Sequence, residues 1–206
     1  MNKSFKGIIL SVQPRIRMMR SFDERSHNYL GYSLLIKDFI DDSEHEFSVG
    51  IGKAVQQKHQ FCIGDEIAGE CLPVADQRLE PVEFYKASKL KKTGTNSTIT
   101  AAPPWENIPP ELDVYRQRGH RRLSAQTYTK KCITCIWGCR MPVEIIIDNW
   151  NPSRRKYRFE TFCYGPLSCR LYKAGPTRKV EGRNGMIWEE EDWVDEEETG
   201  HREFDE

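Results

Sequence analysis

The stretch FCIGDEIAGECLPV, residues 61–74, sets the expected architecture of the first half of the chain. Gly64 and Asp65 are turn-forming residues, and the run that follows them suits a short β-strand. The segment before it, KAVQQKHQF (53–61), has the only helical-looking pattern before residue 92. The pattern therefore predicts a short helix that turns directly into a strand.

Further short apolar runs flank this helix and strand. Strands are predicted at residues 5–19, 29–40, 47–52, 63–74 and 82–92. Polar segments at 21–28 and 41–46 separate the first three strands, and Gly31 predicts a bulge or bend inside the second. A mainly β fold follows, in which five strands with a helix between the third and fourth form a small barrel.

The phrase FCIGDEIAG (61–69) resembles the entry to the fourth strand in OB-fold proteins and related small barrels. The resemblance covers residues 5–92 and implies an OB-like barrel spanning residues 1–92, with an SH3-like barrel as the alternative. OB-folds usually bind ligands on strands 2 and 3 and on the loops after strands 1 and 4. Cations beside a ring suit single-stranded nucleic acid. In and beside the first loop, the expected contacts are Arg15, Arg17, Arg20 and Phe22. The alternative is that Asp23 and Glu24 neutralise this loop while Phe22 packs into the barrel mouth.

Charge is segregated along the chain although the 206 residues carry no net charge. Residues 1–88 have a net charge of −2, residues 89–183 of +12 and residues 184–206 of −10. Clustered positive charge attracts polyanions. No apolar run approaches the roughly 20 residues of a membrane span, and no signal peptide is recognisable. We therefore expect a cytoplasmic protein with no membrane partner.

Residues 93–110 contain four prolines and no periodicity, which predicts a linker. The following segment, 111–123, is predicted to form a short helix that ends at Gly119. Its cations are candidates for phosphate contact, with a solvated helix end as the alternative: Arg116, Arg118, Arg121 and Arg122.

The segment KKCITCIWGCRM (130–141) begins a cysteine cluster. Cys132 and Cys135 precede a predicted hairpin, with strands at 141–150 and 156–162 around a turn at 151–155, and two more thiols follow it. Two thiol-bearing turns separated by a hairpin are the layout of a zinc ribbon. Residues 111–187 are thus predicted to form a small metal-binding module, with zinc held by Cys132, Cys135, Cys163 and Cys169.

Alternatives remain open for this cluster. Cys139 is either an alternative ligand or a buried bystander. An iron–sulphur cluster is also held by four cysteines and is the alternative cofactor. Disulfides are not expected, since the chain has an odd number of cysteines, seven, in metal-like spacing.

The hairpin and the loop-rich stretch after it carry cations among rings, a pattern that suits nucleic-acid contact. The candidates are Arg154, Arg155, Lys156, Arg158, Arg170, Lys173, Arg178 and Lys179. The acidic tail, 188–206, is expected to be a disordered run that docks through its aromatics on a protein partner or on the basic block.

No catalytic motif stands out, so the chain is more consistent with a non-enzymatic protein. The leading hypothesis is a protein that binds RNA or single-stranded DNA through the barrel and the metal-stabilised basic module. The alternatives are a protein–protein adaptor with a structural zinc site and a small iron–sulphur redox protein.

Overall fold

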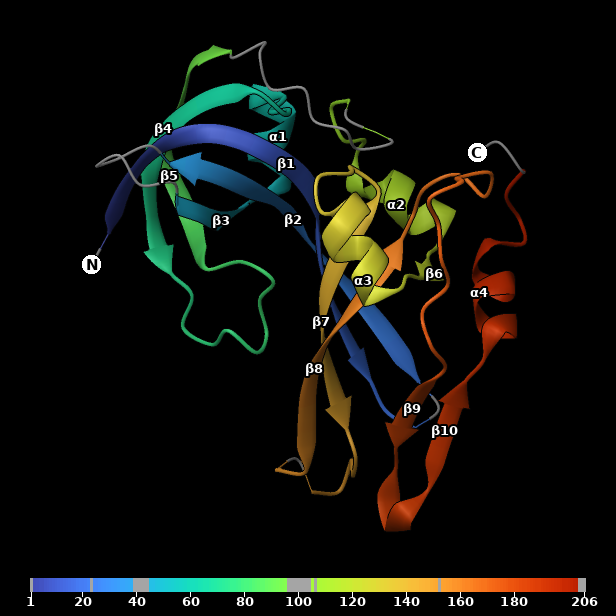
Figure 1. Cartoon of the computed structure of the whole chain (residues 1–206). Helices are drawn as coiled ribbons and strands as arrows, with labels where there is room; N and C mark the ends of the chain where they lie inside the picture. The colour runs from blue at the N-terminus through green and yellow to red at the C-terminus, as the bar shows by residue number, and fades with distance from the viewer. Residues whose placement is uncertain are drawn as a thin grey trace.

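The computed structural model describes residues 2–22, 24–38, 45–95, 105, 107–151 and 153–203. Its fold is mainly β, with one eight-stranded sheet and one two-stranded sheet (Figure 1). The strands of the large sheet are β1 (Lys3–Arg20), β2 (Arg25–Asp38), β3 (His45–Ile51), β4 (Asp65–Pro73), β5 (Phe84–Thr95), β6 (Arg121–Arg122), β7 (Gly138–Ile146) and β8 (Arg155–Cys163). The small sheet pairs β9 (Arg178–Glu181) with β10 (Ile187–Glu190).

The helical elements are short. They are α1 (Lys53–His59), α2 (Leu112–Arg118), α3 (Ala125–Thr127), the π-helical turn η2 (Tyr128–Cys132), the 3₁₀ turn η3 (Arg183–Gly185) and α4 (Asp192–Thr199). None of the helices within the described ranges is long and apolar enough to cross a membrane.

The first five strands close into a ring in the order β1-β2-β3-β5-β4-β1. Neighbours are antiparallel except β3 and β5, which meet in parallel at Val49 and Phe84. Helix α1 connects β3 to β4. The five predicted strands and the single helix are therefore confirmed. The bend is confirmed as well: Gly31 has a φ of 135°, and the β1–β2 register shifts between Arg15 and Ile16.

The ring encloses an apolar core built from alternate residues of its strands. Ile9, Ile16, Leu34, Ile36 and Ile67 are fully buried within one continuous cluster. Burial of each such side chain contributes roughly 1.5–3 kcal/mol. This core fixes which face of each strand looks outward.

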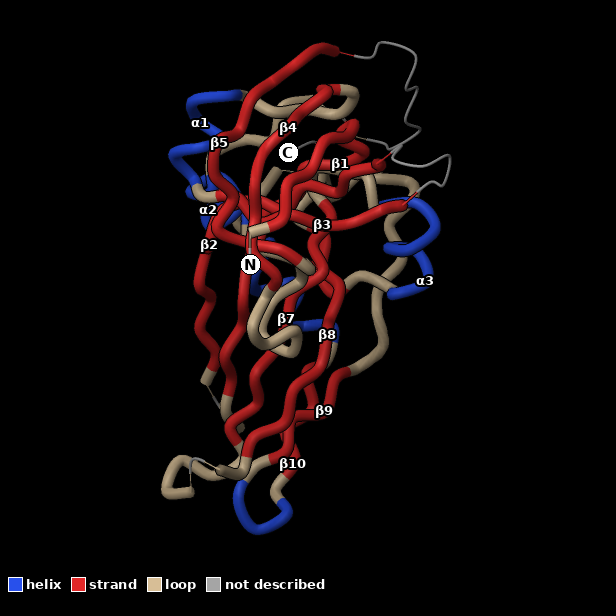
Figure 2. Tube along the Cα trace, turned by 90° about the vertical axis from the view of Figure 1, so that its left-hand side faces the viewer, coloured by secondary structure: helices blue, strands red, loops and turns tan. Residues whose placement is uncertain are grey.

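Strand β1 links the ring to the C-terminal half of the chain. Its last residues pair in parallel with β7, with Met18 opposite Val143 and Arg20 opposite Ile145. Figure 2 shows β7 and β8 running down from the ring beside β1 and β2. The region 21–28 is less loop-like than predicted, because β1 and β2 continue as a long hairpin that stays paired as far as Arg20 and Arg25.

The predicted second hairpin is confirmed as β7–β8, in which β7 ends at Ile146 instead of residue 150 and β8 begins at Arg155 instead of residue 156. The predicted helix is confirmed as α2, and Gly119 ends it with a φ of 66°. Of the predicted linker, residues 96–104 and 106 lie outside the described residues.

The expectation of a disordered acidic tail is wrong for residues 188–199. Strand β10 pairs with β9, and α4 follows it (Figure 1). The stretch 169–185 is likewise less loop-like than predicted, because it contains β9. Like charges in the tail do not drive it away from the protein, since arginines of other segments pair with its carboxylates. Phe204 lies outside the described residues.

Candidate metal centre and cationic surfaces

Three of the predicted ligands lie in one packed cluster. Cys132, Cys135 and Cys163 are buried together with Leu123 and Tyr128. Cys132 ends η2, Cys135 follows in a tight turn, and Cys163 ends β8 opposite Gly138. Cys169 is half-buried in the loop after β8. The structure thus packs thiols from both predicted turns into one cluster.

Gln13 of β1 fastens the first thiol turn to the ring. Its Nε2 donates to the carbonyl oxygens of Cys132 and Cys135, each at 2.8 Å, and its Oε1 accepts from the hydroxyl of Tyr128 at 2.7 Å. The Gln13 side chain is buried. Its amide therefore satisfies three polar groups of the segment 128–140, which we call the thiol segment.

Gly138 is required by a close approach in the same place. A Cβ there would lie 2.5 Å from the carbonyl oxygen of Cys132 and 2.8 Å from Nε2 of Gln13. Any side chain at this position would push the first thiol turn away from β1. Close packing of the first thiol turn against β1 therefore explains why position 138 is a glycine.

Backbone N–H groups point at two of the sulphurs. The amide of Gly165 donates to Sγ of Cys163 at 3.4 Å. Burial raises the pKa of Cys132 to about 11 and that of Cys135 to about 12, although amides of Trp137 and Gly138 oppose the shift at Cys135. These thiols are therefore protonated at neutral pH in the absence of metal, and a bound ion would displace their protons.

Cys139 lies apart from the cluster. Its side chain is fully buried in the main core, and its Sγ faces the carbonyl oxygen of Pro14 at 3.5 Å. Burial raises its pKa to about 12. This environment is that of a core residue next to β1.

The thiols do not converge on one point in this structure. Among the residues that the structure describes, no three side chains of His, Cys, Asp or Glu are grouped closely enough to hold a metal ion. All seven cysteines are free thiols. The donor set fits a soft metal ion by its chemistry, because buried thiolates suit zinc and iron, but zinc at this position remains a prediction.

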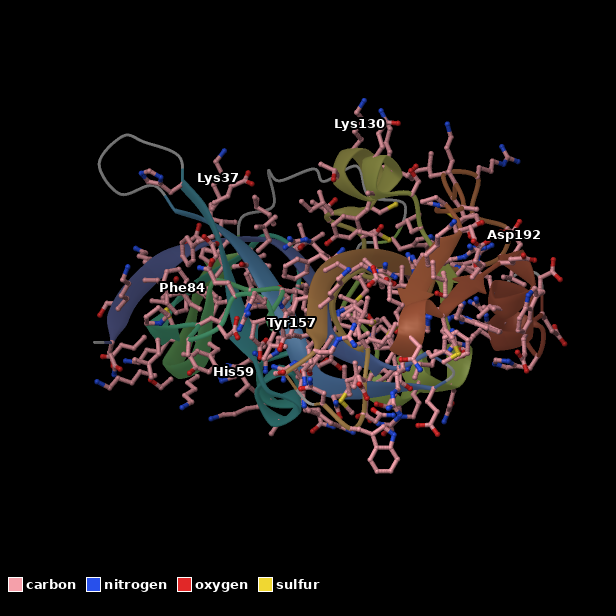
Figure 3. All side chains as sticks on the ribbon, turned by 90° about the horizontal axis from the view of Figure 1, so that it is seen from below. Lys37, His59, Phe84, Lys130, Tyr157 and Asp192 are labelled. Carbon is pink, nitrogen blue, oxygen red and sulfur yellow. The ribbon has the colours of Figure 1, made fainter. Side chains whose placement is uncertain are left out.

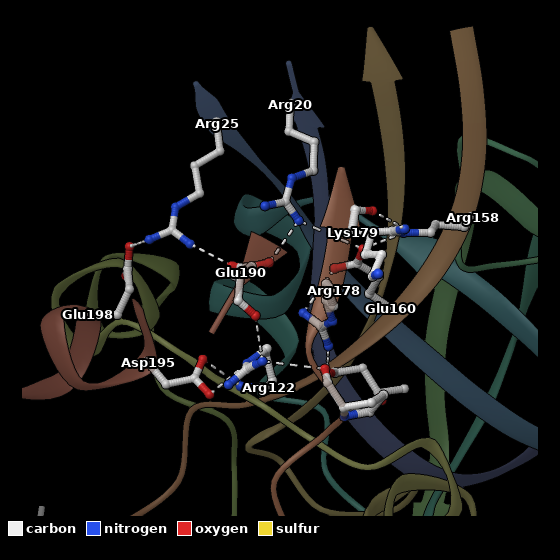
Figure 4. A network of polar contacts seen from close by, with 12 residues as sticks. Arg20, Arg25, Arg122, Arg158, Glu160, Arg178, Lys179, Glu190, Asp195 and Glu198 are labelled. Atoms are coloured by element: carbon white, nitrogen blue, oxygen red, sulfur yellow. Dashed lines mark hydrogen bonds and ion pairs between the residues drawn. The ribbon is translucent and has the colours of Figure 1, made fainter. Parts of the chain in front are cut away.

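The acidic tail closes a buried network of ion pairs (Figure 4). Arg20 donates to Glu190 at 2.9 Å, and Arg25 donates to the other oxygen of the same carboxylate at 3.0 Å. Arg25 also pairs with Glu198. The carboxylate of Glu190 thus bridges two arginines of the β1–β2 hairpin.

A second part of this network surrounds Arg122, whose side chain is 0% exposed. It donates to the carboxylate of Asp195 at 3.0 Å and to the backbone carbonyl of Glu190 at 2.7 Å, and it also pairs with Asp192. Burial alone would raise the pKa of Glu190, but the nearby guanidinium groups of Arg20, Arg178 and Arg25 outweigh it and hold that pKa below its usual value. The tail is therefore docked as a counter-ion to buried arginines.

The sixteen predicted nucleic-acid contacts divide into three groups by exposure. The exposed ones are Arg116, Arg154, Arg155, Lys156, Arg170, Lys173 and Lys179. The half-buried ones are Arg15, Arg17, Phe22, Arg118, Arg121 and Arg158. The buried ones are Arg20, Arg122 and Arg178. A phosphate could reach this last group only if the acidic tail moved.

Several half-buried arginines hold loops in place. Arg17 donates to the carbonyl of Leu79 at 2.9 Å and to Glu80 at 3.0 Å, and Arg15 approaches the same carboxylate at 3.8 Å. These contacts fix the β4–β5 loop (74–83) against β1. Similarly, Arg118 and Arg121 donate to carbonyl groups in the loop after Cys163.

Two cations of β8, Lys156 and Arg158, lie on the face opposite Tyr157 and Phe159, because successive strand residues alternate. Lys156 pairs with Glu181 of β9 at 2.6 Å. Arg158 pairs with Glu160 of its own strand at 2.6 Å and donates to the carbonyl oxygen of Lys179 in β9 at 2.8 Å. On the other face, the guanidinium of Arg78 lies 4.5 Å from the ring centre of Tyr157. We call the face with Tyr157 and Phe159 the aromatic face, although it also holds Arg155, which pairs with Glu144.

A groove lies beside this aromatic face, between the ring and the thiol segment. It has a volume of about 170 Å³. Its lining includes Gln13, Leu35, Ser48, Pro81, Ile133 and Arg140. The guanidinium of Arg140 lies 3.7 Å from the ring centre of Phe159, and both side chains are exposed. We call this feature the barrel groove. Figure 3 shows Lys130 of the thiol segment projecting into solvent.

The sequence reasoning missed Gln13, Arg78 and Arg140. Arg140 directly follows the cysteine-rich stretch, so its position was a usable signal. Arg78 and Gln13 carry no local signal, because their partners are far away in the chain: Gln13 and Cys132 are 119 residues apart.

Comparison of the chain with models of protein families, with curated proteins and with solved structures gave no match.

Proposed function

We propose that this protein binds single-stranded nucleic acid, RNA or DNA, across the barrel groove, without catalysing a reaction. The observation that supports this most directly is the composition of the groove rim. The exposed Arg140–Phe159 stack offers a guanidinium for a phosphate and a ring for a base. Lys130 and Lys131 add exposed positive charge on the thiol segment.

In this proposal the five-strand ring is an OB-like barrel. Its strand order, its single parallel contact and the helix before β4 support that assignment. OB-folds bind ligands on strands 2 and 3 and on the loop between strands 4 and 5. The barrel groove is lined by Leu35 of β2, Ser48 of β3 and Pro81 of the β4–β5 loop, so it lies on the surface that the assignment predicts.

The proposal also includes a structural zinc ion held by Cys132, Cys135, Cys163 and Cys169. The gathering of thiols from both turns in and beside one cluster supports this ligand set. Four thiolates form a closed site, which stabilises a fold and does not catalyse. A metal there would fix the thiol segment and hence the position of Arg140 on the groove.

The first experiment measures binding of a labelled single-stranded oligonucleotide against salt concentration. Affinity should fall steeply between about 50 and 200 mM salt, because phosphate contacts release counterions. Substitution of Arg140 by Ala should weaken binding and lower the slope of log K against log salt by about 0.7. Lys58→Ala, which removes an exposed charge from α1, is the matched control and should change little. Equal behaviour of the two variants would contradict the groove as the binding surface, and no binding by the wild type would favour the adaptor alternative.

A second experiment tests the metal. Protein purified without oxygen should contain one zinc per chain, and a strong chelator should unfold the C-terminal half, because metal-binding free energy of this kind is folding free energy. Cys169→Ser should reduce zinc content, whereas Cys139→Ser should leave it unchanged. If the protein instead contains iron and sulphide and absorbs in the visible region, the cofactor is an iron–sulphur cluster and not zinc. A chain with no stoichiometric metal that stays folded in chelator would exclude both.

A further inference from the structure

A second cavity lies at the end of the β1–β2 hairpin, where the acidic tail crosses it. Its volume is about 240 Å³. The side chains that define it are Arg20, Phe22, Glu24, Trp188, Trp193 and Glu197. The rings of Trp188 and Trp193 are 6.0 Å apart at an interplanar angle of 87°. Three aromatic rings from two distant segments thus surround one space.

The ring of Phe22 is held by a close approach to the backbone. A Cβ on Gly182 would lie 2.8 Å from Cδ2 of Phe22, so only glycine leaves room for the ring there. Trp193 is 47% exposed. An exposed tryptophan beside a fixed phenylalanine gives the cavity an aromatic surface that a flat ligand could reach.

The polar groups of the cavity indicate what such a ligand must offer. Arg20 is only 4% exposed, and its Nε has no hydrogen-bond partner among the described residues. That donor needs an acceptor. At the rim, the exposed carboxylates of Glu24 and Glu197 offer acceptors. The site therefore fits a ligand that carries, on one edge, a hydrogen-bond acceptor for Arg20 and hydrogen-bond donors for the carboxylates.

Charge disfavours the two simplest ligand classes, a free phosphate and an ammonium group. A phosphate would face the carboxylates of Glu24, Glu190 and Glu197, while the guanidinium groups of Arg20 and Arg25 are already paired with Glu190. An ammonium group would compete with these two guanidinium groups for Glu190. A neutral flat ring with mixed hydrogen-bonding groups avoids both penalties. Nucleobases have these properties, and they stack on aromatic side chains.

We propose that this cavity binds one nucleobase and that guanine fits it best. Guanine presents acceptors at O6 and N7, which pair with arginine, and N–H donors, which suit a carboxylate. The inference rests on the proposed function and adds a base-specific subsite to it. The cavity is lined by neither of the groove's stacking residues, Phe159 and Arg140, so it is a separate site on the same molecule.

The experiment titrates the four ribonucleosides and follows the indole N–H signals of the five tryptophans by NMR, assigned with Trp→Phe variants. Guanosine should shift the signals of Trp188 and Trp193 and leave that of Trp150 in place. Trp193→Ala should weaken guanosine binding about tenfold, and Trp193→Phe should keep most of it, because stacking requires only a ring. Trp150→Ala is the matched control, since Trp150 is 84% exposed on the β7–β8 turn.

Guanosine should bind at least about fivefold more tightly than adenosine if the hydrogen-bonding edge is read. Three results would each overturn the inference. The first is equal affinity for guanosine and adenosine, and the second is the absence of any shift in the signals of Trp188 and Trp193. The third is that the Trp193→Ala variant binds guanosine with the same affinity as the Trp150→Ala variant. Salt-dependent oligonucleotide binding without a guanosine site would leave the proposed function standing. Guanosine binding without oligonucleotide binding would support the nucleobase site in this cavity and contradict the proposed function.

Discussion

Inside the five-strand ring the fully buried side chains are mostly apolar, such as those of Ile9 and Leu34, whereas beyond residue 110 the buried set includes several charged residues: Arg122, Glu160 and Glu190. The ring excludes water from apolar surface, which is a non-directional force. The C-terminal half shares this apolar core through residues such as Met141 and Phe162, and it adds buried charges that are surrounded by opposite charges. The first kind of core tolerates changes of pH and of single partners better than the second, because a buried charge without its partner is expensive.

The two regions meet at residues that belong to both. Strand β1 contributes Ile9 to the ring core, Gln13 to the thiol segment and Arg20 to the tail network. One strand therefore joins an apolar core to two polar clusters. Substitutions that remove only one of these three contacts therefore measure how much each region contributes to the free energy of unfolding.

The largest effect is expected from Arg122→Met. The substitution removes the guanidinium from Asp195 and from the carbonyl of Glu190, and leaves these groups without their partner. Breaking a buried pair in this way costs about 3–5 kcal/mol of unfolding free energy. Urea denaturation followed by tryptophan fluorescence measures the change.

Arg116→Met is the control for this prediction. It makes the same chemical change on α2, where the side chain is 62% exposed, and exposed ion pairs contribute at most about 1 kcal/mol. If both variants lost the same stability, the C-terminal half would not depend on its buried charges more than on its surface charges.

A smaller loss is expected from Gln13→Leu, which cuts the link between the ring and the thiol segment. Two carbonyl groups and the hydroxyl of Tyr128 lose their partner, at a cost of about 2–3 kcal/mol. The thiols of Cys132 and Cys135 should then react faster with a thiol reagent. Gln57→Leu, on the exposed surface of α1, is the control. Unchanged thiol reactivity in Gln13→Leu would show that the thiol segment holds its position without β1.

The same contrast explains how far the sequence predicts this molecule. The ring strands follow from local patterns, because alternation and turn residues such as Gly64 act within a few positions. The thiol turns and their hairpin are local as well, which is why the spacing of Cys132, Cys135 and Cys163 predicts that they gather. Metal binding itself is not settled by that gathering.

Docking of the tail on the basic block is one of the sequence predictions, and Asp195 does pair with Arg122 of that block. The individual partners in the tail and in the polar clusters could not be predicted in this way. Glu190 pairs with Arg20 across 170 residues, and no pattern near either residue indicates the other. Composition alone assigns the tail to disorder, because it counts like charges and omits distant partners. The arginines predicted to contact phosphates include three that the fold uses as buried counter-ions, since charge density in a sequence does not distinguish the two uses.

The smallest effect is expected from the protonation of His27 of β2, which contacts His120 beside the ion-pair network. His27 and His120 have ring centres 4.9 Å apart, and His120 also packs on Phe162. Burial and the positive charges of Arg25 and Arg20 lower the pKa of His27 to about 4, against an attraction from Glu190. Burial, with the charges of His27, Arg25, Arg178 and Arg20, lowers the pKa of His120 as well.

The pKa of His27 in the folded chain lies below the value of about 6.5 in the unfolded chain. As pH falls, His27 is therefore protonated in the unfolded chain before it is protonated in the folded chain. Stability should therefore be present above about pH 6.5 and decline toward pH 4, with a loss of about 2 kcal/mol for His27 between about pH 7 and pH 5. Carboxylates remain mostly ionised over that interval, so they do not mask the effect. Urea midpoints at the two pH values measure it. His27→Gln, which cannot take up this proton, should lose less stability than the wild type, and an equal loss in both would place the pH dependence outside this histidine pair.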